Sequence, residues 1–224
     1  MAKTAGKIYM DPEIGEILFK KSVRSRSIGI RVHPVKGVSV TVPYIIPYAA
    51  ARVFFQTRRD WVLQTIARQK EKYKDAVLPT EAEIDALRLQ AKNELPARLS
   101  ELALRYGFAY NRVTIKHNAT NWGSCSAKGN INLNLNIVRL PRALQDYILL
   151  HELCHLRHQD HGHGFHLLLE HVLTDNLLKL MDDMGLSEAD RTLVTDVARK
   201  SAVSKARYPL DYTITRLIKR FPIV

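Results

Sequence analysis

With 224 residues and 46% apolar side chains, the chain can form one large domain or two small ones around a real hydrophobic core. Its apolar runs are short and interrupted, which argues against a membrane-spanning helix, and the first residues lack the apolar run of a secretory signal. Two cysteines, Cys125 and Cys154, are too few for a disulfide framework, so we expect a cytoplasmic protein.

The net charge of +12 is concentrated at the two ends of the chain. Residues 1–75 carry 15 Lys and Arg against 6 Asp and Glu, residues 76–198 carry 12 against 15, and residues 199–224 carry 7 against 1. Basic ends can make weak electrostatic contacts with nucleic acid, or they can be a solvated surface that aids solubility. The charges form no dense run and no known binding motif accompanies them, which favours the solvated surface.

The first 45 residues have the pattern of a β-meander. Apolar residues alternate with other residues over 28–33 and 38–42, which predicts two strands, and residues 16–20 can form a further strand. A helix is then predicted from Pro47 to about Ala76, because apolar residues recur near helical spacing.

A second long helix is predicted over residues 80–107, where Pro96 should kink or split it. Two strands follow, at 112–117 and 130–138, and the second alternates apolar residues with asparagines. The segment 121–126 between them is less regular. Its backbone could form an edge along which an extended peptide pairs.

The rest of the chain has mainly helical patterns. Helices are predicted over 141–159, 165–184 and 187–202, with glycines at 162, 164 and 185 as breaks. No clear pattern is present from Ser204 onward.

Seven of the nine histidines lie between positions 151 and 171, and residues 151–155 read HELCH. On a helix, residues four apart lie about 6 Å apart along the axis and about 40° around it, so His151 and His155 can bind one zinc ion from the same side. Glu152 then lies at the flank of the pair, where it can act on a metal-bound water. The string therefore predicts a catalytic zinc site.

Catalytic zinc usually has three protein ligands, and His161 is the predicted third. It follows His155 by six residues, a spacing also found in the metzincin pattern, and two glycines close behind it allow the chain to fold back. His166 is the leading alternative, whereas His158 is too far along the helix to join the pair. Cys154 is expected to pack in the core. Tyr147, one turn before the motif, is a candidate donor to a developing oxyanion, but a packing role is favoured for it.

Three segments together resemble the YgjP-like family of zinc-dependent metallohydrolases. They are WGSCS at 122–126, GNINLN at 129–134, and the histidine-rich segment from 151 to 165. The resemblance covers about residues 15–172. It implies a zincin-like fold with His151, His155 and His161 as zinc ligands and Glu152 as the catalytic acid and base.

The same family looks distantly similar to SprT-type metalloproteases, whose relatives act on DNA-bound proteins. The sequence departs from the family pattern at two positions: Asn121 stands where arginine is common, and His166 where tryptophan is common. Residues from about 173 onward have no clear counterpart.

The sequence thus predicts an α+β, zincin-like fold with an N-terminal β-meander, long helices, a small sheet packed on the metal-binding helix, and a helical C-terminal extension. The expected domains are a meander plus helix at 1–78, the zincin-like metal-binding catalytic domain at 79–203, and a basic C-terminal tail at 204–224.

The expected function is a zinc-dependent hydrolase, most simply a metallopeptidase acting on peptides or proteins, with metal-activated water and Glu152 as general base. One alternative is a non-catalytic, zinc-stabilised module that binds nucleic acid. Another is a zinc hydrolase of a non-peptide amide or ester. Glu152 argues against the first alternative, because a structural zinc site prefers four protein ligands.

Overall fold

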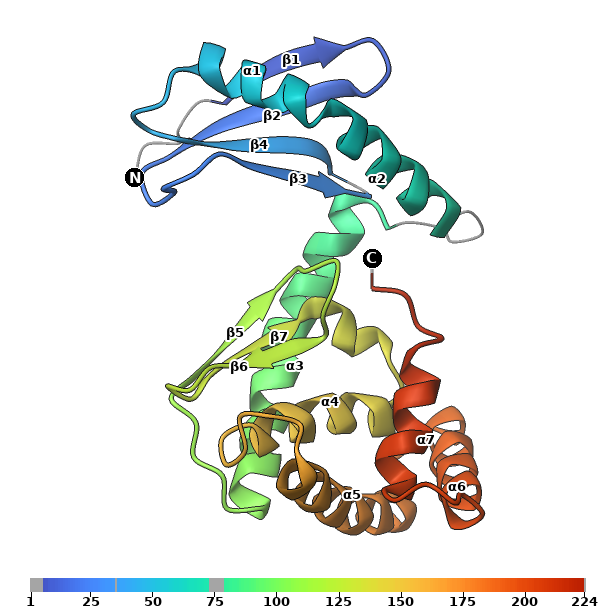
Figure 1. The fold of residues 1–224 in the computed structure, drawn as a ribbon. Helices are drawn as coiled ribbons and strands as arrows, with labels where there is room; N and C mark the ends of the chain where they lie inside the picture. Colours follow the sequence, from blue (N-terminus) through green and yellow to red (C-terminus); the bar gives the residue numbers. More distant parts are fainter. Residues whose placement is uncertain (1–5, 35, 73–78, 224) are drawn as a thin grey trace. The chain divides into compact units, whose positions relative to one another are not determined.

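The computed structural model describes residues 6–34, 36–72 and 79–223. The chain divides into two compact units, one of residues up to Glu81 and one from Ala82 to Ile223 (Figure 1). The first unit contains a four-stranded sheet and the second a three-stranded sheet.

The sheet of the first unit has the strand order β1-β2-β4-β3. Its strands are β1 (Lys7–Asp11), β2 (Gly15–Ser22), β3 (Gly29–His33) and β4 (Gly37–Pro43). β2 and β4 are parallel neighbours, so the predicted β-meander, in which consecutive strands pair, is wrong in its order. Val38, Val40 and Val42 of β4 are all buried, which suits a central strand and leaves β3 at the edge. Alternation in the sequence identifies strands and their buried faces, but it does not identify their neighbours.

Two helices replace the single predicted helix that begins at Pro47. They are α1 (Tyr48–Thr57) and α2 (Arg59–Lys72), and they lie across one face of the sheet (Figure 1). Ala51, Phe55 and Val62 form one buried cluster with the valines of β4. The predicted helix end near Ala76 lies outside the described residues.

The second unit contains both helices and strands, so the predicted α+β class is confirmed. Its elements are α3 (Glu81–Arg105), β5 (Arg112–Lys116), β6 (Gly123–Cys125), β7 (Asn130–Asn134), a 3₁₀ helix η1 (Leu135–Arg139), α4 (Arg142–Cys154), α5 (His163–Asp182), α6 (Glu188–Ala202) and α7 (Pro209–Ile218). The strand order is β5-β7-β6, and β6 packs on α4, the helix of the histidine motif. α3 continues through Pro96, so of the two predicted effects the split is wrong and the kink stays a prediction.

The predicted strand 130–138 ends at Asn134 because this side chain redirects the backbone. Its Oδ1 accepts a hydrogen bond from the backbone N–H of Asn136 (3.1 Å), and its Nδ2 donates to the carbonyls of Asn118 (2.7 Å) and Asn121 (2.9 Å). Local bonds from a side chain to the backbone compete with a strand ladder. The chain therefore turns into η1, in which Leu135 and Ile137 are buried.

A buried carboxylate fixes α4 between its neighbours. Asp146 is fully buried and accepts two hydrogen bonds from Arg98 of α3, Nε to Oδ1 at 2.8 Å and Nη2 to Oδ2 at 2.5 Å. Asn176 of α5 donates a third at 3.0 Å. Three helices are thus joined at a point five residues before His151, which places the histidine motif relative to both other helices.

Helix α7 lies in the segment from Ser204 onward, so the expectation of no regular pattern there is wrong. The Glu170 carboxylate of α5 accepts hydrogen bonds from the backbone N–H groups of Leu210 (2.9 Å) and Asp211 (3.0 Å), which satisfies donors that the first turn of a helix leaves free. Leu210, Ile214 and Leu217 are buried. α7 is therefore packed into the second unit. Across the described residues, none of the helices has the length and apolarity to cross a bilayer.

Candidate metal centre and its surroundings

Three histidine side chains converge at the end of α4. One ring nitrogen each from His151, His155 and His161 lies within 4.8 Å of the other two, and the Nε2 atoms of His151 and His161 are 3.1 Å apart. Nitrogens bound to one tetrahedral zinc ion are about 3.3 Å apart, given a Zn–N distance of about 2.0–2.1 Å. The three rings can therefore hold one ion with small adjustments.

The turn after α4 brings His161 back to the helix. α4 ends at Cys154, earlier than predicted, because the chain tightens: the N–H groups of Leu156 and Arg157 donate to the carbonyls of Leu153 (3.0 Å) and Cys154 (3.1 Å), three residues back. His155 is the cap residue of the helix.

The glycines after this turn allow two close contacts. A Cβ atom at Gly164 would lie 2.8 Å from the ring of His158, and at Gly162 it would lie 3.0 Å from the Asp160 carboxylate. The His158 ring thus packs against α5, and it is not among the three converging rings.

Neighbouring groups orient the three rings. The fully buried ring of Phe165 lies under all of them, with centroids 4.9 Å from His151, 4.6 Å from His155 and 4.7 Å from His161. Nδ1 of His155 is 3.0 Å from the carbonyl oxygen of His158, so its Nε2 is left for a ligand. A metal-binding histidine commonly donates its second nitrogen in this way.

The surroundings of His151 and His161 favour the neutral form of the ring. Burial lowers the pKa of His151 to about 4, and burial together with the neighbouring His155 lowers the pKa of His161. Neutral imidazole is the metal ligand, so both shifts favour metal binding.

Glu152 points to the other side of this group, against β6. It is 5% exposed, and its Oε2 is buried with no hydrogen-bond partner among the described residues. A Cβ atom on Gly123 would lie 2.5 Å from Oε1 of Glu152, so the carboxylate occupies space that only glycine leaves free. Burial raises the pKa of Glu152 to about 8. A buried carboxylate without a partner is costly, and a nearby cation with its solvent would remove that cost.

A family model matches the part of the chain that contains the three histidines. Residues 72–177 match the family model described as YgjP-like, metallopeptidase domain. The predicted YgjP-like resemblance is confirmed for residues 72–177, and its predicted extension upstream to about residue 15 stays a prediction. No curated protein matches the sequence. Among solved structures, the chain is similar to the crystal structure of the metallopeptidase zymogen of Pyrococcus abyssi abylysin, with 22% identity, 42% of this chain and 97% of that chain covered, and a TM-score of 0.32.

The YgjP-like match ends within α5, at residue 177, so α6 and α7 lie outside it. Their residues nevertheless complete the surroundings of the histidine group. Asp211 of α7 accepts a hydrogen bond from the Tyr147 hydroxyl (2.6 Å), and its second oxygen is 2.7 Å from Nδ1 of His166. Tyr147 is 8% exposed, and burial followed by the Asp211 charge raises its pKa. Its hydroxyl is thus bonded to Asp211, and the suggested role as an oxyanion donor is not supported.

The two departures from the YgjP-like pattern have distinct structural roles. The Asn121 side chain donates to the Gly123 carbonyl (3.0 Å) and so supports the start of β6. His166, the alternative ligand, is not one of the three grouped histidines; it is bonded to Asp211 and stacked on Tyr208, with ring centroids 5.1 Å apart. Sequence reasoning missed Asp211 and Tyr208, because α7 has no pattern that relates it to the motif.

The cysteines are not grouped with the histidines either. Cys154 is fully buried and burial raises the pKa of its thiol to about 12. Burial and then the charge of Glu152 raise the pKa of Cys125 to about 11. Neither thiol is prepared to ionise, which agrees with the predicted packing role of Cys154.

Proposed function

We propose that the chain is a zinc-dependent metallopeptidase in which His151, His155 and His161 bind zinc and Glu152 is the general base. The observation that carries the proposal is the convergence of three histidine rings beside a buried carboxylate that has no partner in the described structure. The YgjP-like metallopeptidase match supports a metal-dependent peptidase family.

Zinc fits this donor set better than other common metals. Three imidazoles without thiolate or clustered carboxylates suit a tetrahedral ion, and three protein ligands with one position left for water are typical of catalytic zinc. When bound, zinc supplies Lewis acidity and lowers the pKa of its water toward 7.

Glu152 performs the proton transfers in this proposal. Its carboxylate takes the proton of the attacking water and later gives it to the leaving amine. Its burial between α4 and β6 keeps the pKa high in the metal-free protein, and a nearby cation lowers it to a range where both the proton-accepting and the proton-donating forms are accessible.

β6 provides a place for an extended peptide. It is an edge strand of the three-stranded sheet, and Gly123 within it contacts Glu152. An unpaired strand edge can bind a peptide through backbone hydrogen bonds. Pairing along β6 would bring the peptide backbone next to the carboxylate, which favours a peptide over a small amide or ester.

The non-catalytic alternative has less support. A structural zinc site needs a fourth protein ligand, and the described residues place only three candidate side chains within reach of one ion. Hydrolysis of a non-peptide amide or ester uses the same groups, so a substrate test must separate it from peptide hydrolysis.

Metal removal provides that test. Protein stripped of metal with a chelator is expected to lose cleavage of a mixed peptide library, and one equivalent of zinc should restore it. Mass spectrometry of the products measures cleavage, and simple amide and ester substrates are assayed in parallel. Metal-replete protein that hydrolyses the small esters but no peptide would contradict the peptidase assignment.

Gly123→Ala tests the position of Glu152. The new methyl group would overlap the carboxylate, so Glu152 must shift, and kcat/KM should fall by about 100-fold because displacements near 1 Å at a reacting group have such effects. Zinc content should stay near one per chain. Gly29→Ala, where the new Cβ would meet nothing within 4 Å, is the matched control and should keep its activity. Wild-type activity in Gly123→Ala would show that Glu152 need not occupy this position.

A further inference from the structure

A cavity of about 520 Å³ lies between the histidine motif and the C-terminal helix. Its wall on the motif side includes Tyr147 and His151 of α4 and His166 of α5, and its opposite wall includes residues 206–208 and α7 with the residue after it. Because His151 is one of the three converging histidines, a group in this cavity would lie next to the proposed reacting centre. The C-terminal wall lies outside the YgjP-like match.

The cavity is strongly basic. Arg207, Arg216 and Lys219 line it, and within the described part of the chain none of them forms an ion pair. The one acidic lining residue is Asp211, which is 8% exposed and whose oxygens bond to Tyr147, Thr215 and His166. Three cationic side chains and one carboxylate therefore line the cavity, and the oxygens of that carboxylate already have partners within the wall.

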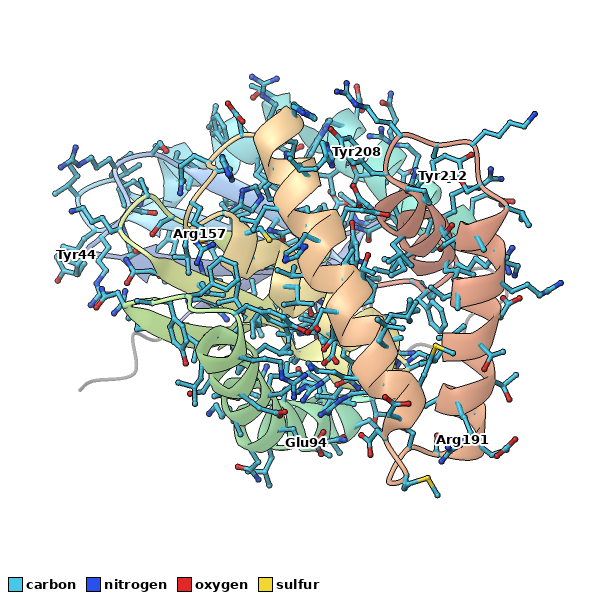
Figure 2. The ribbon with its side chains drawn as sticks, turned by 90° about the horizontal axis from the view of Figure 1, so that it is seen from below. Tyr44, Glu94, Arg157, Arg191, Tyr208 and Tyr212 are labelled. Carbon is cyan, nitrogen blue, oxygen red and sulfur yellow. The ribbon has the colours of Figure 1, made fainter. Side chains whose placement is uncertain are left out.

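Aromatic rings hold both arginines. The Arg216 guanidinium lies over the ring of Tyr212 at 5.6 Å, and its Nη1 donates to the Tyr212 hydroxyl at 2.8 Å. The Arg207 guanidinium lies over Tyr208 at 5.7 Å, and Tyr208 stacks on His166. Figure 2 shows Tyr208 and Tyr212 on the same side of the molecule, on the C-terminal segment. Ordered guanidinium groups lose less freedom when they bind an anion.

We infer that this cavity binds a carboxylate of the substrate, which makes the enzyme selective for peptides with an acidic group close to the cleaved bond. The inference rests on the proposed function. A guanidinium matches a carboxylate with two parallel hydrogen bonds, and the position beside His151 means that the bound carboxylate belongs to a residue near the reacting carbonyl.

Nucleic acid is the competing ligand for these cations. A second basic hollow of about 430 Å³ on α7 shares Tyr212 and Arg216 with the cavity and adds Lys205 and Arg220. The adjacency of the cavity to the motif favours the carboxylate, because a polynucleotide would gain nothing from contact with His151. The carboxylate itself can come from an Asp or Glu side chain or from a free C-terminus, and the experiment separates these sources.

The test compares matched peptides that differ in one group. The four peptides carry either Glu or Gln at both residues that flank the cleaved bond, combined with either a free or an amidated C-terminus. If the carboxylate belongs to a side chain, the wild-type kcat/KM is expected to be at least about 10-fold higher for the Glu peptides than for the Gln peptides. If it belongs to the C-terminus, the same ratio is expected between the free and the amidated peptides. The reason is that charge-assisted hydrogen bonds are about twice as strong as neutral ones. The variant Arg207→Gln/Arg216→Gln/Lys219→Gln should lose this ratio. Lys92→Gln, which removes one exposed charge from α3, should keep it.

The outcomes separate this inference from the proposed function. Peptide cleavage with equal rates for all four peptides overturns the inference and leaves the peptidase intact. If no peptide is cleaved, the affinity of zinc-loaded Glu152→Gln protein for the same peptides is measured instead. Tighter binding of the Glu peptides or of the free-end peptides, lost when the three cations are also replaced, supports the inference. Equal affinity for all four peptides overturns it. A single-stranded oligonucleotide that binds more tightly than every peptide, and loses that binding in the triple variant, also overturns it.

Discussion

Zinc-loaded Glu152→Gln protein should lose between about 10²- and 10⁴-fold of its hydrolytic rate, because an amide cannot take the proton of the attacking water. The substitution conserves the shape of the side chain, and the glutamine fits the space beside Gly123 that the carboxylate occupies. Zinc content and the circular dichroism spectrum should match the wild type. The rate is measured with any peptide found by library screening, under metal-replete conditions. Retained activity in this variant would remove Glu152 from the role of general base.

The same variant has an expected effect on stability in the metal-free protein. Burial raises the pKa of Glu152 from its ordinary 4.5 to about 8, so between these values the folded chain holds a proton that the unfolded chain releases. The free energy of unfolding therefore falls as pH rises through this window. Glu152→Gln lacks this titration, so its stability relative to the wild type should rise from pH 5 to about pH 8. Chemical denaturation of both metal-free proteins across this range measures the difference.

Much of the candidate site could be predicted because its signals are local. The spacing of His151 and His155 on a helix follows from helix geometry alone, and Glu152 between them has a fixed position relative to the pair. The glycines after His161 indicate that the chain can turn back. The structure brings the three histidines together as expected. One detail differs: α4 ends at Cys154, so His155 is the C-cap residue and not part of the helix.

The parts that could not be predicted depend on contacts between distant segments. Gly123 is separated from Glu152 by 29 positions, and nothing in the sequence around it shows that its missing side chain leaves room for a carboxylate. The sequence does not show that β4 pairs with a neighbouring strand on each side, between β2 and β3. The apolar residues of α7, at 210, 214, 217 and 218, do recur at helical spacing, and sequence reasoning missed them. The position of α7 against α5 could not be predicted, because it depends on a bond from Glu170 to the first turn of α7. These contacts form only when the chain folds, so the local sequence does not show them.

His161→Ala should weaken zinc binding by more than about 100-fold, which exceeds the usual effect of losing an outer hydrogen-bond partner. The remaining pair on α4 offers only two nitrogens, too few for a stable tetrahedral site. His158→Ala is the matched control: its ring packs on Gly164, and the backbone carbonyl that contacts His155 remains. Competition with a chromogenic chelator measures the affinities. Zinc retained by His161→Ala but lost by His166→Ala would identify His166 as the third ligand.

Zinc K-edge X-ray absorption of the wild-type protein tests the central claim most directly. We expect three imidazole nitrogens at about 2.0–2.1 Å and one solvent oxygen, with no sulfur in the coordination shell. The imidazole signal should fall to two in His161→Ala and remain at three in His158→Ala. A shell of four protein ligands, or one that contains sulfur from Cys125 or Cys154, would describe a structural zinc site and would contradict the catalytic centre proposed for this chain.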